Sequence, residues 1–160
     1  MVMMKKYLPL GILIFSLQTL AFLTSYFVTE TAVNSWYQGI VKSPLSPPDW
    51  LFAPVWTTLY AMLAVALWQL WQLRAHMQAR KAMLFFGVQL IANYTWSFVF
   101  FGMANFHAAF WLLVFIIFFT LRTMMTAWPV KRSVVWLLVP YLAWLGFASH
   151  LAYAVMTLNP

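Results

Sequence analysis

The sequence predicts an all-α integral membrane protein, a single five-helix membrane domain over residues 1–160 with an ordered, proline-rich first loop. Hydrophobic residues make up 65% of the chain and charged residues 7%, which is too little polar surface for a water-soluble domain of this length. Five apolar stretches each reach the length of about 20 residues with which a helix crosses a bilayer. Nearly all basic residues fall on one side of these spans, as membrane insertion favours.

The first span is expected at residues 7–28. It follows Lys5 and Lys6, and a basic start before an apolar run also resembles a signal peptide. The apolar run is longer than the roughly 7–15 residues of a signal peptide, and no A-x-A-like cleavage site follows it. We therefore expect this span to be retained in the bundle.

The first loop, residues 29–49, is the only long connection. It contains the pair Trp36-Tyr37, and prolines 44, 47 and 48 hold its backbone extended. Pro48 suits the opening turn of the next helix, where a missing N–H costs little. Two interpretations are open. The aromatic residues form an interfacial belt, or the loop is a structured lid over the mouth of the bundle, since long ordered loops are often functional.

The second and third spans, residues 50–73 and 82–103, each place large aromatic side chains on one helix face. The faces consist of Trp56, Tyr60, Leu63 and Leu67 in the second span and Gln89, Asn93, Trp96 and Phe100 in the third. A face with two amides is expected to contact protein rather than lipid. Its amides either join helices through hydrogen bonds worth roughly 0.6–2 kcal/mol each, or orient an apolar ligand in a pocket.

The fourth and fifth spans are expected at residues 106–128 and 134–156, after a tight turn at Ala104-Asn105. Arg122 near the end of the fourth span is expected to extend to the membrane surface. The fifth span has a face formed by Pro140, Trp144, Ala148 and Leu151. Three helices that offer aromatic residues toward the same end can enclose a flat hydrophobic ligand beneath the first loop.

The basic residues orient the chain. With the N-terminus on one side, eight of the nine share that side: Lys5, Lys6, Arg74, Arg80, Lys81, Arg122, Lys131 and Arg132. We expect this side, with the N-terminus and basic loops, to be cytoplasmic, and the first loop and C-terminus to lie opposite. A bacterial inner membrane is favoured, and an outer membrane is the alternative. Because insertion explains the charge, no nucleic-acid partner is expected.

The sequence offers no conventional catalytic site. It has no cysteine, and its only carboxylates are Glu30 and Asp49, so metal-dependent or hydrolytic chemistry is not expected. Of the histidines, His150 lies about 120° around its helix from Trp144, at 100° per residue. We therefore expect it to make a structural or dimer contact rather than to be an axial haem ligand.

Several motifs, taken together and in this order, resemble the tryptophan-rich sensory protein family, which includes the mitochondrial translocator protein or peripheral benzodiazepine receptor. They are the proline-rich first loop, Asn93 with Trp96-Ser97 in the third span, and Pro140-Tyr141 with Trp144 in the fifth. The resemblance covers nearly the whole chain.

The resemblance implies a five-helix bundle, commonly a homodimer, that binds porphyrins and other tetrapyrroles as well as benzodiazepine-type ligands. No resident cofactor is required, and protoporphyrin IX or haem is the expected ligand. By position, the implied ligand-binding residues are Tyr37, Pro47, Trp56, Asn93, Trp96, Trp144 and Ala148. The pair Trp56 and Trp144 resembles the one that the family associates with light-dependent porphyrin breakdown.

Three positions depart from the family pattern. Ser43 and Leu45 follow Lys42 where the family usually has proline and tryptophan, and Ala152 replaces an asparagine of the fifth span. The sterol motif of animal members is incomplete, because no basic residue follows Tyr153. The sequence thus favours a tetrapyrrole-binding sensor or regulator of tetrapyrrole metabolism, with photochemical porphyrin degradation or transport of hydrophobic ligands as alternatives.

Overall fold

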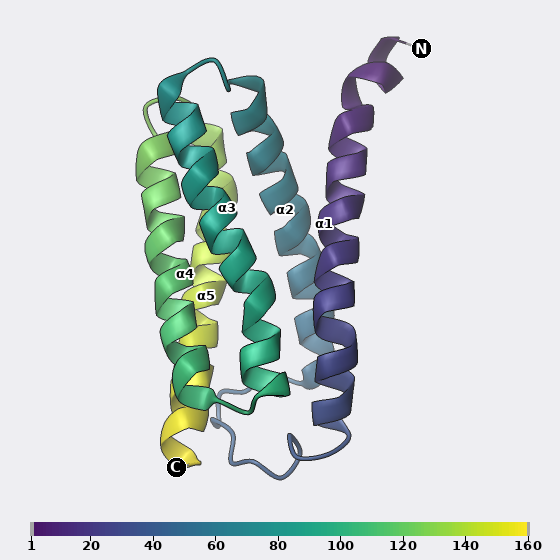
Figure 1. The fold of residues 1–160 in the computed structure, drawn as a ribbon, viewed down its shortest axis with the longest axis vertical. Coiled ribbons are helices and arrows are strands. Elements are labelled where there is room, and N and C mark those ends of the chain that lie inside the picture. The colour runs from purple at the N-terminus through teal and green to yellow at the C-terminus, as the bar shows by residue number, and fades with distance from the viewer. Residues whose placement is uncertain (1, 160) are drawn as a thin grey trace.

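The computed structural model describes residues 2–159, which form five long helices packed side by side (Figure 1). The helices are α1 Val2–Val33, α2 Phe52–Gln72, α3 Met77–Ser97, α4 Phe106–Ala127 and α5 Arg132–Leu158. All five are long and apolar enough to cross a membrane, and the described residues contain no β-strand. The predicted fold class, an all-α bundle of five transmembrane helices, is confirmed.

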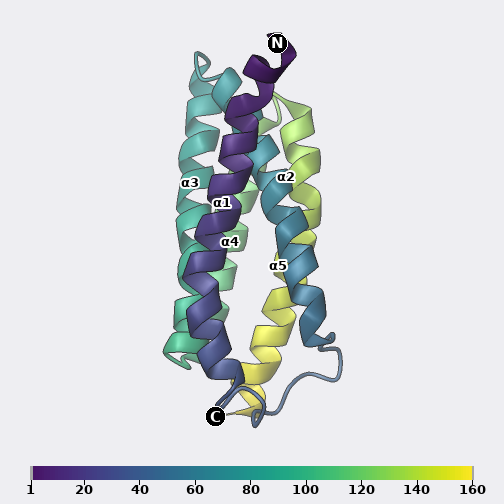
Figure 2. The same ribbon diagram turned by 90° about the vertical axis from the view of Figure 1, so that its right-hand side faces the viewer.

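The helices alternate in direction, so their connections divide between two ends of the bundle (Figures 1 and 2). The N-terminus, the α2–α3 connection and the α4–α5 connection lie at one end, which we call the basic end because it carries Arg74, Lys131 and Arg132. The first loop, the α3–α4 turn and the C-terminus lie at the other, which we call the loop end.

Several helix ends differ from the sequence prediction, and two of these differences change the connections between helices. Helix α1 continues past residue 28 to Val33, since no glycine or proline interrupts this stretch and the Thr31 hydroxyl bonds back to the Phe27 carbonyl at 2.8 Å. The first loop is therefore shorter than residues 29–49. Helix α3 begins at Met77, directly after the extended His76, so Arg80 and Lys81 belong to a helix rather than to a basic loop.

The end of α3 widens before the chain turns. Residues Phe98–Gly102 form a π-helical segment, η2, a feature often found at functional sites. The predicted turn at Ala104-Asn105 is present: Ala104 adopts a positive φ of 48°, and the Asn105 side chain accepts a bond of 3.0 Å from the Ala108 N–H to cap α4. This turn brings α4 back along α3.

The core lies between α2, α3, α4 and α5, whereas only Leu17 and Ala32 are buried among the described side chains of α1. The fifth helix is rotated from the predicted face. Pro140 is exposed, and the neighbouring Tyr141 is fully buried together with Leu145. This rotation directs the Tyr141 hydroxyl toward the amides of α3. Trp144 and Ala148 are half-buried at the edge of the buried face.

Candidate functional site

Aromatic side chains from α2, α3 and α5 meet in the half of the bundle nearer the loop end. We call this group the inner aromatic cluster; its members are Phe52, Trp56, Tyr60, Tyr94, Tyr141, Trp144 and Phe147. The rings of Trp56 and Trp144 stand at 89° to each other with centroids 6.4 Å apart. Such edge-to-face pairs contribute to packing beyond their buried area.

A chain of hydrogen bonds lies directly beside this cluster. Tyr60 donates to the Asn93 oxygen at 2.5 Å, and the Asn93 amide nitrogen donates to the Tyr141 hydroxyl at 3.2 Å. Tyr141 in turn donates to the Gln89 oxygen at 2.6 Å. The chain joins α2, α3 and α5, so the predicted amides of the third span do serve interhelical hydrogen bonding.

Two buried donors of the site have no acceptor among residues 2–159. They are the indole N–H of Trp144 and the amide nitrogen of Gln89. Leaving a buried donor without a hydrogen bond costs about 1–3 kcal/mol of folding free energy, so few buried donors in proteins lack a partner. An acceptor oxygen on a bound molecule would satisfy either of them.

A second group of rings lies at the loop end, where the first loop meets η2. We call it the loop cluster; its members are Trp36, Tyr37, Trp96, Phe100, Phe101 and Phe106. Trp96 stacks on Phe100 at 5.0 Å and donates its indole N–H to the Ala109 carbonyl at 3.1 Å. Trp96 also packs against the main core, whose buried members include Tyr60 and Tyr141 of the inner aromatic cluster.

The first loop is attached to the end of α5. The Asn159 side chain accepts from the Val41 N–H at 3.0 Å and donates to the Val41 carbonyl at 2.9 Å, as a neighbouring strand would. Closer to the core, the buried Ser43 hydroxyl lies 3.4 Å from Nε2 of His150. These contacts favour the interpretation of the loop as a structured lid, whereas Trp50 is 71% exposed and suits an interfacial belt.

Tyr37 connects the loop to the charges of the loop end. The Lys42 ammonium lies 3.7 Å from the centre of the Tyr37 ring, a cation–π contact. Burial, with a smaller contribution from the Asp49 carboxylate, raises the pKa of Tyr37 above its usual value of 10. The phenol therefore stays neutral at physiological pH, and the contact does not depend on its ionisation.

The structure places the predicted ligand residues in three groups. Trp56 and Trp144 are in contact within the inner aromatic cluster, and Ala148 packs against the same core. Asn93 is hydrogen-bonded to two members of this cluster, Tyr60 and Tyr141. Tyr37 and Trp96 belong to the loop cluster, and the half-buried Pro47 belongs to neither cluster.

His150 turns away from the inner aromatic cluster, as its helical position predicts. It is exposed, and its ring contacts Ser43 of the first loop. The described residues contain no group of three or more His, Cys, Asp or Glu side chains able to hold a metal ion.

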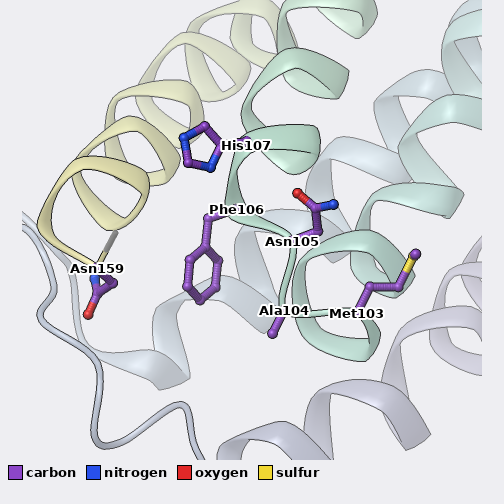
Figure 3. A pocket seen from close by; sticks show the side chains of 6 residues that line it. All are labelled: Met103, Ala104, Asn105, Phe106, His107 and Asn159. Atoms are coloured by element: carbon purple, nitrogen blue, oxygen red, sulfur yellow. The ribbon is translucent and has the colours of Figure 1, made fainter.

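A surface hollow of about 390 Å³ lies at the loop end, between the α3–α4 turn and the end of α5 (Figure 3). It is lined by Met103, Ala104, Asn105, Phe106, His107 and Asn159, none of which is a predicted ligand residue. Two of its polar side chains are already used, since Asn105 caps α4 and Asn159 holds Val41. We therefore place the candidate site in the inner aromatic cluster, where rings fill the space in this conformation.

Sequence reasoning did not assign roles to Tyr141, Tyr94 and Phe52. Tyr141 lies three residues before Trp144, a spacing that places both on one helix side and could have identified it. Tyr94 stacks on Tyr60 at 5.6 Å and donates to the Leu17 carbonyl at 3.2 Å. No local signal predicts that contact, because it joins residues far apart in the chain.

Comparisons with known proteins agree with the motifs. Residues 12–158 match the model of the TspO/MBR family. A "Tryptophan-rich protein TspO" of Chlorobaculum tepidum is 36% identical over 99% of this chain and 100% of its own length. A protein of the same name from Archaeoglobus fulgidus is 38% identical over 83% of this chain and 86% of its own. The "Translocator protein" of Homo sapiens is 32% identical over 84% and 80% respectively.

Proposed function

Because the chain belongs to the TspO/MBR family, we propose that it is a membrane-embedded binding protein for porphyrins and related tetrapyrroles, acting as a sensor or regulator of their metabolism. Benzodiazepine-type molecules, which are also aromatic and largely apolar, would occupy the same site. The site consists of Trp56, Trp144 and Ala148, with Asn93 behind them and Tyr37, Pro47 and Trp96 on the side of the first loop.

The unpaired indole N–H of Trp144 carries this proposal. It lies among rings whose faces suit a flat apolar macrocycle, and it lacks the acceptor that a buried donor needs. A porphyrin carboxylate, or the carbonyl of a smaller aromatic ligand, would supply that acceptor. Apolar walls with a few polar groups are typical of small-molecule sites.

Entry of a macrocycle requires the rings to move apart. The contacts of the first loop with Asn159 and His150 lie at the loop end of α5, above the cluster. We propose that release of these contacts opens the path.

The proposed orientation puts the basic end in the cytoplasm and the first loop opposite, in a bacterial inner membrane by preference. The proposed assembly is a homodimer.

Titration of the protein with protoporphyrin IX in the dark tests the binding proposal. Binding is monitored by the quenching of tryptophan fluorescence. The wild-type protein is expected to show saturable quenching, and Trp144→Ala to weaken binding by about tenfold or more. Trp111→Ala is the matched control, because Trp111 is 64% exposed on α4. Absence of saturable quenching in both detergent and lipid would overturn the proposal.

A second candidate function is light-dependent breakdown of the bound porphyrin. The contact between Trp56 and Trp144 favours it, since a macrocycle bound there would place its excited state beside two readily oxidised indoles. Under light and oxygen, the wild-type complex should lose porphyrin absorbance faster than free porphyrin in the same detergent. At saturating ligand, Trp56→Phe and Trp144→Phe should stop this loss, and equal bleaching rates would exclude the function.

A further inference from the structure

A second hollow, of about 300 Å³, lies at the basic end between the last turn of α2 and the start of α5. Its lining is Trp68, Gln69, Gln72, Leu73, Lys131 and Ser133. Five of these six side chains carry a polar group, counting the indole N–H of Trp68. The hollow is at the opposite end of the bundle from the inner aromatic cluster and is independent of the proposed function.

The hollow contains a cation without a counter-ion. The Lys131 ammonium has no ion pair or hydrogen bond with any residue of the described range 2–159. The only acidic residues of the whole chain, Glu30 and Asp49, belong to the loop end. An anion that pairs with Lys131 must therefore come from outside this chain.

The neighbouring amides add neutral donors. Ser133 donates to the Gln69 oxygen at 2.5 Å and so joins the start of α5 to the end of α2. The exposed Gln72 side chain has no hydrogen-bond partner within residues 2–159. Gln72 of α2 and Lys131, which directly precedes α5, thus line one hollow with their donors unused.

Aromatic residues mark the depth of the hollow in the membrane. Trp71 and Trp128 are 57% and 45% exposed, and such rings are enriched at the membrane–water interface. Each is covered by an arginine, with Arg74 4.9 Å from the Trp71 ring and Arg132 5.3 Å from the Trp128 ring. At this depth the abundant anions are the phosphates of lipid headgroups.

We propose that this hollow binds the phosphate of an anionic phospholipid. Lys131 supplies the charge and Gln72 a neutral donor, while Trp68 lies against the glycerol and upper acyl region. Membrane insertion alone explains why basic residues gather at one end, but it requires no particular lysine to face a hollow. The proposal therefore distinguishes Lys131 from other cations of the same end, and this difference can be tested.

Native mass spectrometry of the full chain with added lipid provides the test. Dioleoylphosphatidylglycerol and dioleoylphosphatidylcholine carry the same acyl chains and differ in net charge. Lys131→Gln is compared with Arg80→Gln, which removes the same charge from an exposed residue of α3 that does not line the hollow. Gln72→Ala is compared with Gln78→Ala in the same way. Glycerol phosphate at millimolar concentration serves as the lipid-free phosphate.

The wild-type protein is expected to retain phosphatidylglycerol in preference to phosphatidylcholine. Lys131→Gln should weaken that retention by about fivefold, and Arg80→Gln should leave it unchanged. If Lys131→Gln does not yield folded protein, a several-fold loss in Gln72→Ala but not in Gln78→Ala supports the site. Equal losses in Lys131→Gln and Arg80→Gln, no preference for the anionic lipid, or displacement by glycerol phosphate would each overturn the proposal.

Discussion

Trp144 is the residue at which packing and polarity conflict. Its ring contacts Phe52, Trp56 and Phe147, yet its indole N–H is buried without an acceptor. Phenylalanine would fill much of the same space without bringing an unpaired donor. The proposed ligand would supply the missing acceptor for this indole N–H.

Trp144→Phe separates these two roles. The variant keeps an aromatic ring but loses the indole N–H together with the second ring of the indole, so we expect it to fold and to bind protoporphyrin IX about fivefold to tenfold more weakly. Fluorescence titration measures the change, with Trp111→Phe as the lipid-facing control. An affinity equal to that of the wild type would mean that the ligand does not accept from this indole.

Tyr141 holds the centre of the hydrogen-bonded chain. Tyr141→Phe leaves the Gln89 oxygen and the Asn93 amide nitrogen without partners in the interior. We expect a loss of about 1–3 kcal/mol in the free energy of unfolding, measured by thermal or denaturant unfolding in detergent. Tyr153→Phe is the control, because Tyr153 is 51% exposed. An equal loss of stability in both variants would contradict the stabilising role of the hydrogen bonds made by Tyr141.

At the scale of elements, hydropathy and charge predict the five spans, because the length of a membrane helix is set by the bilayer. The helix ends are less predictable. Helix α1 continues to Val33 and α3 starts at Met77, since polar residues such as Thr31 and Arg80 stop neither helix. Spacing also predicts the inward stripe of Gln89 and Asn93 and the face of the second span that contains Tyr60. It does not predict that these amides bond to Tyr60 and Tyr141, because the tyrosines come from other helices.

Asn159, directly after α5, joins the first loop to the end of this helix through two hydrogen bonds with Val41. Asn159→Ala removes both bonds to the Val41 backbone and should loosen the segment that contains Lys42. Because Lys42 is the only basic residue of this loop and is followed by serine, trypsin reports on it directly. We expect faster cleavage after Lys42 in Asn159→Ala and an unchanged rate in Asn34→Ala, whose side chain is exposed.

That outcome also bears on ligand exchange. If the loop closes the path to the inner aromatic cluster, Asn159→Ala should speed the dissociation of protoporphyrin IX, measured by stopped-flow fluorescence. Unchanged cleavage together with unchanged dissociation would show that the contacts with Val41 do not hold the loop closed.

At the scale of the whole molecule, the separation of charge between the two ends predicts the orientation in the membrane. The chain has no cysteine, so single cysteines can be introduced without background. We expect Gln38→Cys in the first loop to react with a membrane-impermeant maleimide on intact cells, and Gln78→Cys at the basic end to react only after permeabilisation. The opposite pattern would reverse the orientation.

The account as a whole depends on a ligand lying among the rings of α2 and α5. A structure of the protein with protoporphyrin IX bound tests this most directly. We predict that the macrocycle contacts Trp56 and Trp144, with an acceptor oxygen in hydrogen-bonding range of the Trp144 indole N–H and the first loop displaced from its present contacts. A macrocycle bound only in the hollow beside His107, or on the lipid-facing surface, would contradict it.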